Sequence, residues 1–313
     1  MDTRRIGSLE VSVVGLGCNN FGGRIDEGAS RAVVAAALDA GITFFDTADI
    51  YGGTLSEEFL GRALGDRRGE AVVATKFGMA VDADRQGADP RYVRSALEDS
   101  LRRLGTDHVD LYQLHQPDPE TPLEDTLAAL DEQVREGKVR EIGCSNFTAE
   151  QLRQARRAVA DGAARFVSVQ NEYSVLHRRP EEEVLAECEA EQMAFIPYFP
   201  LARGLLTGKY RRGEPPPAGT RLAGVAAEQY ERLATDDALG AVERLTRIAE
   251  GHGHDVVELA VAWLLARRSV ASVIAGATRP EQVRANAAAG NWVLGPDVLS
   301  EVDAAVPPGP VSR

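Results

Sequence analysis

The 313-residue sequence predicts an α/β fold, the (β/α)8 TIM barrel. Eight short apolar segments rich in β-branched residues recur along the chain, as expected of fully buried parallel strands. Helical patterns lie between them, and this alternation continues without dividing the chain into two halves. A doubly wound open sheet is the structural alternative, but no GxGxxG motif follows the first strand. We therefore expect one barrel domain over residues 1–313.

The expected strands and helices can be placed in order along the chain. The strands are SVVGLGC from residue 12, ITFFDT from 42, AVVATK from 71, VDLYQLH from 109, VREIGCS from 139, RFVSVQN from 165, MAFIPY from 193 and VASVIAG from 270. The main helical patterns cover residues 28–41, 89–105, 121–137, 148–162, 179–191 and 255–268. In the second of these, Asp89 is the expected N-cap, Pro90 takes the first helical position and Gly105 ends the helix.

Two segments are additional to the eight-fold alternation. Residues 3–12, TRRIGSLEVS, predict a short hairpin with a Gly-Ser turn, placed to close the bottom of the barrel. Residues 201–235 form a long loop after the seventh strand, rich in Gly, Pro and Arg. Loops of this length are usually functional lids or disordered segments.

Composition excludes several classes of function. The net charge of −13 argues against binding to nucleic acid or to an anionic membrane surface. No apolar run reaches the length of a membrane span, and the N-terminus lacks the apolar stretch of a secretory signal. The cysteines, Cys18, Cys144 and Cys188, are too scattered for a disulfide framework or a metal site. We expect a cytoplasmic protein without a metal.

Four titratable side chains follow the ends of neighbouring strands. Asp46, Lys76 and His115 end the second, third and fourth strands, and Tyr51 lies in the loop after Asp46. In a barrel of this type the carboxyl ends of the strands form the active-site face. Taken singly, each has an ordinary explanation as a cap, a turn residue or a solvated strand end. Together at one mouth, they predict a catalytic site.

Their chemistry suits protonation of an oxygen atom. A phenol has a pKa of about 10, and an ammonium about 4 Å away stabilises the phenolate by roughly 4 kcal/mol at an effective dielectric near 20. Lys76 is therefore expected to lower the pKa of Tyr51 toward neutrality, with Asp46 holding Lys76 in place. His115 would orient a carbonyl oxygen toward Tyr51. Reduction of that carbonyl also needs a hydride donor, such as a nicotinamide.

The chain resembles the aldo-keto reductase superfamily over nearly its whole length. The resemblance rests on GLGCNNFG (15–22), FFDTADIYGGTLSEEFLGRAL (44–64), VVATKFG (72–78), VDLYQLHQPDP (109–119), VREIGCSNF (139–147), VQNEYS (169–174), IPYFPLARGLLTGKY (196–210) and IAGATRPEQVRAN (274–286). It implies NADP(H) bound in an extended pose, a small-molecule carbonyl substrate, Tyr51 as general acid, Lys76 and Asp46 as its tuning pair, and His115 as the carbonyl orienter.

The resemblance also implies a set of cofactor contacts. Around the nicotinamide these are Gly17, Cys18, Asn19, Ser145, Asn146, Gln170 and, stacked under the ring, Tyr198. The long loop would contribute Pro200, Leu201, Ala202, Gly204, Lys209 and Arg221. The adenosine end would lie among Gly276, Ala277, Thr278, Gln282 and Asn286. The phosphate that distinguishes NADPH from NADH would be bound by Lys209 and Arg221 of the long loop and by Arg279. Arg279 lies at the start of the helix that receives the adenosine.

Two other classes of function stay open at this point. Relatives with this motif set include auxiliary subunits of membrane channels, so a nicotinamide-binding regulatory subunit with little turnover is the main alternative. A barrel isomerase or lyase without a redox step is the other. We expect turnover of a simple aldehyde with NADPH to separate the reductase from both alternatives.

Overall fold

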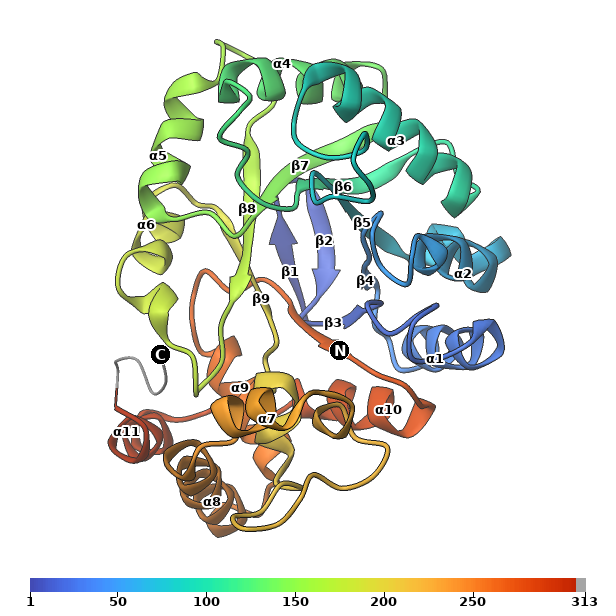
Figure 1. The fold of residues 1–313 in the computed structure, drawn as a ribbon. Coiled ribbons are helices and arrows are strands. Elements are labelled where there is room, and N and C mark those ends of the chain that lie inside the picture. The colour runs from blue at the N-terminus through green and yellow to red at the C-terminus, as the bar shows by residue number, and fades with distance from the viewer. Residues whose placement is uncertain (308–313) are drawn as a thin grey trace.

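The computed structural model describes residues 1–307, and its centre is a barrel of eight parallel strands (Figure 1). The strand order is β10-β3-β4-β5-β6-β7-β8-β9. Their bounds are β3 Val14–Gly17, β4 Phe44–Asp46, β5 Val72–Phe77, β6 Val109–Leu114, β7 Val139–Ser145, β8 Phe166–Glu172, β9 Ala194–Tyr198 and β10 Val273–Gly276. Each expected strand is present, so the predicted (β/α)8 TIM barrel is confirmed.

The barrel is nearly closed between β9 and β10, the two strands at the ends of this order. Phe195 in β9 forms an isolated parallel bridge with Val270, just before β10, and the Ala271 N–H donates to the Phe195 carbonyl over 2.9 Å. Because parallel strands all point the same way, their carboxyl ends meet at one mouth of the barrel. The predicted strand-end residues therefore share one face of the molecule.

The expected N-terminal hairpin is also present, as β1 (Thr3–Ile6) and β2 (Leu9–Ser12), paired antiparallel. Ile6 and Val11 are fully buried. They pack with the inward-facing side chains of the strands, including Phe44 and Leu111. Figure 1 shows the hairpin in the middle of the ring of strands. It fills the end of the barrel opposite the strand-end residues, as predicted.

The helices surround the strands and bury the outer face of the barrel (Figure 1). Their bounds are α1 Glu27–Asp39, α2 Leu55–Leu64, α3 Pro90–Leu104, α4 Leu123–Arg135, α5 Ala149–Ala158, α6 Val184–Ala190, α7 Ala227–Leu233, α8 Asp236–Gly251, α9 Val256–Leu265, α10 Pro280–Ala289 and α11 Pro296–Ala305. The predicted boundaries of α3 hold: the Asp89 carboxylate accepts from the Arg91 N–H over 2.9 Å, and Gly105 is left-handed. No helix among residues 1–307 combines the length and apolar character needed to cross a membrane.

One helix is shorter than its sequence pattern. Residues 179–191 divide into a 3-10 turn (Arg179–Glu181) and α6. The buried Arg178 explains the break, because its guanidinium binds Glu181 over 2.8 Å and also Asp303, the latter in α11. The local pair with Glu181 and the long-range pair with Asp303 fix the start of the segment in a turn rather than in a continuous helix.

The segment after β9 has more regular structure than a loop. It contains the 3-10 helices Ala202–Thr207 and Leu222–Gly224, followed by α7. Leu222 and Tyr210 are buried, and the Tyr210 hydroxyl accepts from the Leu222 N–H over 3.3 Å. The segment therefore has its own small packed centre, which fixes its path across the barrel mouth.

Candidate active site

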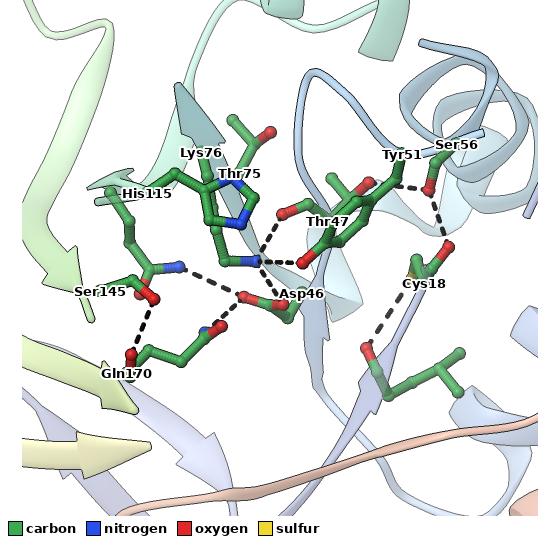
Figure 2. Close-up of polar contacts among 12 residues, drawn as sticks. Cys18, Asp46, Thr47, Tyr51, Ser56, Thr75, Lys76, His115, Ser145 and Gln170 are labelled. Carbon is green, nitrogen blue, oxygen red and sulfur yellow. Dashed lines mark hydrogen bonds and ion pairs between the residues drawn. The ribbon is translucent and has the colours of Figure 1, made fainter. Parts of the chain in front are cut away.

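Tyr51 is carried by a tight turn between β4 and α2. Gly52, Gly53 and Thr54 are all left-handed, with φ of 59°, 64° and 81°. A side chain at position 52 is impossible, because a Cβ there would lie 2.1 Å from the Phe21 carbonyl oxygen. Only glycine satisfies both the backbone angle and the close approach. This turn directs the Tyr51 ring back over the strand ends (Figure 2).

Lys76 and Asp46 form an ion pair inside the barrel. The Lys76 ammonium lies 2.5 Å from Asp46 Oδ1 and 2.8 Å from the Thr47 carbonyl oxygen. Both side chains are almost completely buried. Burial by itself lowers the pKa of Lys76, but the charges of Asp46 and Tyr51 outweigh it, so the pKa of Lys76 is raised. Lys76 is therefore a fixed, charged group.

The second carboxylate oxygen of Asp46 is held by two side-chain amides. Gln113 donates to Asp46 Oδ2 over 3.2 Å and Gln170 over 2.8 Å. Gln113 was not among the site residues predicted from the sequence. The signal was present, since Gln113 is a polar residue in an apolar strand, two positions before His115 and therefore on the same face. Gln113 and Gln170 fix the orientation of Asp46 and, through it, of Lys76.

The Tyr51 hydroxyl lies 3.4 Å from the Lys76 ammonium, as the sequence interpretation requires. The expected change in its pKa has the wrong sign, however. Burial is the largest influence and raises the pKa of Tyr51, Lys76 lowers it, and Asp46 raises it again. Burial, the larger cause, does not follow from the sequence, and Asp46 at 2.5 Å from Lys76 cancels part of the field of that ammonium. The phenol therefore keeps its proton at neutral pH.

His115 follows β6 and meets Tyr51 edge to face. The two ring centroids are 5.8 Å apart, with an interplanar angle of 79°. Burial and the nearby Lys76 lower the pKa of His115 to about 3. Its Nδ1 is buried and has no hydrogen-bond partner within residues 1–307. The imidazole is therefore neutral and has one N–H group to offer to a ligand oxygen.

Four residues at the ends of β7, β8 and β9 form a continuous hydrogen-bond network. The Ser145 hydroxyl donates to the Gln170 carbonyl over 2.7 Å, and the Asn146 amide donates to the His115 carbonyl over 2.9 Å. The Tyr198 hydroxyl donates to Asn146 Oδ1 over 2.8 Å. Asn146 is exposed and left-handed, with φ of 62°. These contacts fix a polar wall beside His115.

The start of the segment after β9 has an unusual backbone. Phe199, Ala202 and Arg203 have φ of 52°, 45° and 57°, and Gly204 has φ of 100°. Left-handed non-glycine residues each cost roughly 1–2 kcal/mol, so such a cluster persists only where the surroundings impose it. The neighbouring Lys209 ammonium folds back onto Gly204. Pro200 and Leu201 lie within the same turn.

Four cations gather where this segment approaches the loop after β3 and the start of α10. Burial and the charges of Arg24, Arg279 and Arg221 lower the pKa of Lys209, and burial with Arg24 and Arg203 lowers that of Arg221. Arg221 donates to Asn20 over 3.3 Å. Among residues 1–307, none of Arg24, Lys209, Arg221 and Arg279 forms an ion pair. The cluster is an uncompensated positive region in an acidic protein.

The end of β10 and the start of α10 complete this face. The Asn20 amide donates to the Ala277 carbonyl over 3.2 Å, which joins the loop after β3 to β10. A Cβ at Gly276 would come within 3.3 Å of Asn19 and Asn20. Gln282 accepts from the Thr278 N–H over 2.8 Å, so its carbonyl is used within the protein. Asn286 is buried in α10.

Comparison with known proteins decides the family. The model of the aldo/keto reductase family matches residues 13–307. This chain belongs to that family. Aldo-keto reductase YhdN of Bacillus subtilis is 34% identical over 304 residues, which cover 94% of this chain and 90% of that protein. Membership of the aldo-keto reductase family supports oxidoreduction of small carbonyl compounds.

Two further relatives of this aldo-keto reductase carry more specific names. Aldo-keto reductase yakc [NADP(+)] of Schizosaccharomyces pombe is 34% identical, over 91% of this chain and 85% of that protein. A probable voltage-gated potassium channel subunit beta of Oryza sativa is also 34% identical, over 91% of this chain and 90% of that protein. The same barrel is therefore found under an enzyme name and under a channel-subunit name.

The aldo-keto reductase structure brings together Asp46, Tyr51, Lys76 and His115, as expected from their positions at strand ends (Figure 2). Gly17 and Cys18 lie directly beside Asp46, since the Cys18 N–H donates to the Asp46 carbonyl over 2.8 Å. Cys18 is fully buried, and burial raises the pKa of its thiol. Arg24 was missed, because one exposed arginine after two glycines gives no distinguishing signal in the sequence.

Proposed function

We propose that this protein reduces an aldehyde or ketone to an alcohol with NADPH, and that Tyr51 is the general acid. The observation that carries the proposal is the buried Lys76 ammonium, held between Asp46 at 2.5 Å and the Tyr51 hydroxyl at 3.4 Å. A buried ion pair that touches a phenol at the barrel mouth is the arrangement needed to give a proton to a substrate oxygen. The bound nicotinamide would supply the hydride.

Tyr51, Lys76 and His115 would each act differently on the carbonyl oxygen of the substrate. Tyr51 holds its proton because burial raises the pKa of the phenol, so it is ready to donate. As the oxygen gains negative charge, Tyr51 passes on its proton, and Lys76 stabilises the phenolate that is left. The neutral His115 directs its N–H to the same oxygen and fixes its position beside Tyr51.

The polar wall at the ends of β7 to β9 fits the nicotinamide amide group. Asn146 is exposed, and the Tyr198 ring is half-buried, so both offer surface to a planar ligand. Ser145 belongs to the same network. Gln170 fits less well than expected, because its side chain is buried and one N–H of its NH2 group donates to Asp46. Gln170 therefore contributes mainly through Asp46.

The four-cation cluster supports NADPH over NADH. The extra phosphate of NADPH carries between one and two negative charges near neutral pH. Burial and the neighbouring arginines, Arg221 among them, lower the pKa of Lys209, and burial with Arg24 and Arg203 lowers that of Arg221, so an anion placed in the cluster relieves this repulsion. Gly276, Thr278, Asn286 and the start of α10 would then receive the adenosine. The name of the S. pombe relative points to the same cofactor.

We also place the protein in the cytoplasm, acting on a small carbonyl compound as one domain over residues 1–313. Its three cysteines are free and buried, which suits a reducing compartment.

The second candidate function is that of a nicotinamide-binding auxiliary subunit. The name of the rice relative favours it.

Turnover separates the two functions. The full-length protein is mixed with NADPH and a panel of aldehydes and ketones that includes 4-nitrobenzaldehyde, and loss of the nicotinamide absorbance band is followed. Carbonyl-dependent loss that is absent in Tyr51→Phe supports the reductase. Tight NADPH binding, seen by a shift in its fluorescence, without turnover of any carbonyl, supports the auxiliary subunit instead.

A further inference from the structure

A second buried carboxylate lies close to Tyr51 and has no part in the proposed chemistry. Asp49 is in the turn between β4 and α2, two residues before Tyr51, and only 2% of its surface is exposed. Its N–H donates to the Lys76 carbonyl over 3.1 Å, just as the Thr47 N–H donates to Ala74 over 2.8 Å. The main chain of Asp49 is therefore bound to the residue whose side chain touches the Tyr51 hydroxyl.

The side chain of Asp49 has little to stabilise a negative charge. Within residues 1–307, its Oδ1 has no hydrogen-bond partner. Its Oδ2 accepts a 3.5 Å hydrogen bond from the Tyr92 hydroxyl of α3, and the backbone N–H of Ile50 gives the carboxylate some further support. A buried carboxylate in such surroundings is costly when ionised and tolerated when protonated.

Arg103, the cation that lowers the pKa of Asp49 most, is already paired with Glu57. Arg103 in α3 donates to Glu57 Oε2 over 2.6 Å, and Thr75 donates to Glu57 Oε1 over 2.5 Å. Glu57, in α2, is itself fully buried. The titratable groups that face Asp49 come from four elements: Glu57 from α2, Arg103 and Tyr92 from α3, Lys76 from β5 and Tyr112 from β6.

Their net effect disfavours a charged Asp49. Burial is the largest influence on the pKa of Asp49, and Glu57 adds to it. Arg103, the backbone N–H of Ile50 and Lys76 act in the opposite direction, and the pKa of Asp49 still rises from 3.8 to about 7. An ionised Asp49 is repelled by Glu57 and gains by moving toward water. Such a movement displaces the turn that holds Tyr51.

We propose that Asp49 is a positioning residue for Tyr51, and that it holds the catalytic turn in place only while its carboxyl group is neutral. The catalytic part of this inference rests on the proposed function. We then expect activity to fall as the pH rises through neutrality, because Asp49 ionises there. Loss of the Tyr51 proton would act only at higher pH, because the pKa of that phenol is raised above 10.0.

Three variants test the inference in the full-length protein. Asp49→Asn mimics the neutral acid, Asp49→Ala removes the side chain, and Asp39→Asn makes the same chemical change at the exposed end of α1. The kcat for NADPH-dependent reduction is measured from about pH 5.5 to about pH 9. We expect wild type and Asp39→Asn to lose on the order of tenfold in kcat across neutrality, and Asp49→Asn less than about twofold. Asp49→Ala should have a lower kcat throughout.

Thermal unfolding gives a readout independent of turnover. Because the pKa of Asp49 is raised in the folded state, its stabilising effect is complete below about pH 3.8 and is lost as the pH rises through about 7. The Tm of Asp49→Asn should therefore exceed that of wild type by more at pH 8 than at pH 5. An equal difference at both values, or identical kcat profiles in wild type and Asp49→Asn, would overturn the inference. Absence of turnover in wild type at every pH would instead overturn the proposed function, and with it the positioning role.

Discussion

The strand ends of the barrel and the segment 199–235 are built in opposite ways. At the strand ends, Lys76 and Asp46 are buried, paired and held by further hydrogen bonds. In the segment, Lys209 and Arg221 lie near other cations and have no carboxylate partner in the described part of the chain. The charges of the first region are balanced within the protein, whereas the cations of the second region are arranged to bind an anion.

From this difference we expect the strand ends to control the rate of the chemical step and the segment to control the affinity for the cofactor. A change at the strand ends leaves a buried charge without its partner, so we expect it to affect both the chemical step and the stability of the fold. A change in the segment removes one contact to a ligand, so we expect it to affect binding and to spare folding. The predictions below test this separation.

The largest effect is expected for Lys76→Met. The substitution conserves volume but leaves Asp46 buried without its cation, which should lower stability by about 3–5 kcal/mol and abolish turnover. The double variant Lys76→Met/Asp46→Asn is the control. It should regain part of the lost Tm without regaining activity. A double variant that is as unstable as the single one would show that the ion pair does not dominate the strand ends.

Tyr51→Phe should affect the rate alone. Its hydroxyl makes one 3.4 Å contact with Lys76, so the fold should tolerate the loss. We expect kcat to fall by on the order of 10²–10⁴, the usual contribution of a general acid. Isothermal titration should show NADPH affinity within about threefold of wild type. Full activity in this variant would remove Tyr51 from the mechanism.

The convergence of the candidate catalytic residues could be predicted from the sequence because buried parallel strands are apolar throughout. A lysine after VVAT or a histidine after LYQL is conspicuous in such a context, and all strand ends face the same way. The pKa of Tyr51 was predicted wrongly for a physical reason. The position of Lys76 follows from strand order, but the burial of the Tyr51 phenol and the distance between Lys76 and Asp46 do not.

The segment 199–235 shows where sequence reasoning ends. Its length and its glycines predicted a functional loop, but Ala202 and Arg203 give no sign that their backbone is left-handed. The cation cluster likewise joins Arg24 and Arg221, which lie almost 200 positions apart in the sequence. Long-range contacts of this kind, like the pairing of Arg178 with Asp303, are set by packing and not by local pattern.

Arg221→Ala should weaken binding without affecting folding. One charge-assisted contact contributes roughly 1.5–3 kcal/mol, so the Kd for NADPH should rise by on the order of 10–100-fold. The Kd for NADH should change little. Arg211→Ala, at an exposed position of the same segment, is the matched control and should leave both affinities unchanged. Equal affinities for the two cofactors in wild type, unaltered in Arg221→Ala, would show that Arg221 does not bind the extra phosphate of NADPH.

The smallest effect concerns the backbone of the segment. Ala202 has φ of 45°, an angle that costs an alanine roughly 1–2 kcal/mol and a glycine almost nothing. Glycine also loses more conformational entropy on folding, by roughly 0.5–1 kcal/mol, so Ala202→Gly should stabilise the protein by at most about 1.5 kcal/mol. Calorimetry should show a Tm higher by roughly 1–3 °C.

The matched control is the same substitution in a regular helix. Ala36 lies within α1, where glycine costs about 1 kcal/mol relative to alanine, so Ala36→Gly should lower the Tm. Opposite signs for the two variants would mean that the segment stores backbone strain, which is consistent with a turn shaped for a ligand rather than for stability. If Ala202→Gly lowers the Tm as Ala36→Gly does, the turn is not strained, and the cations alone distinguish the segment from the strand ends.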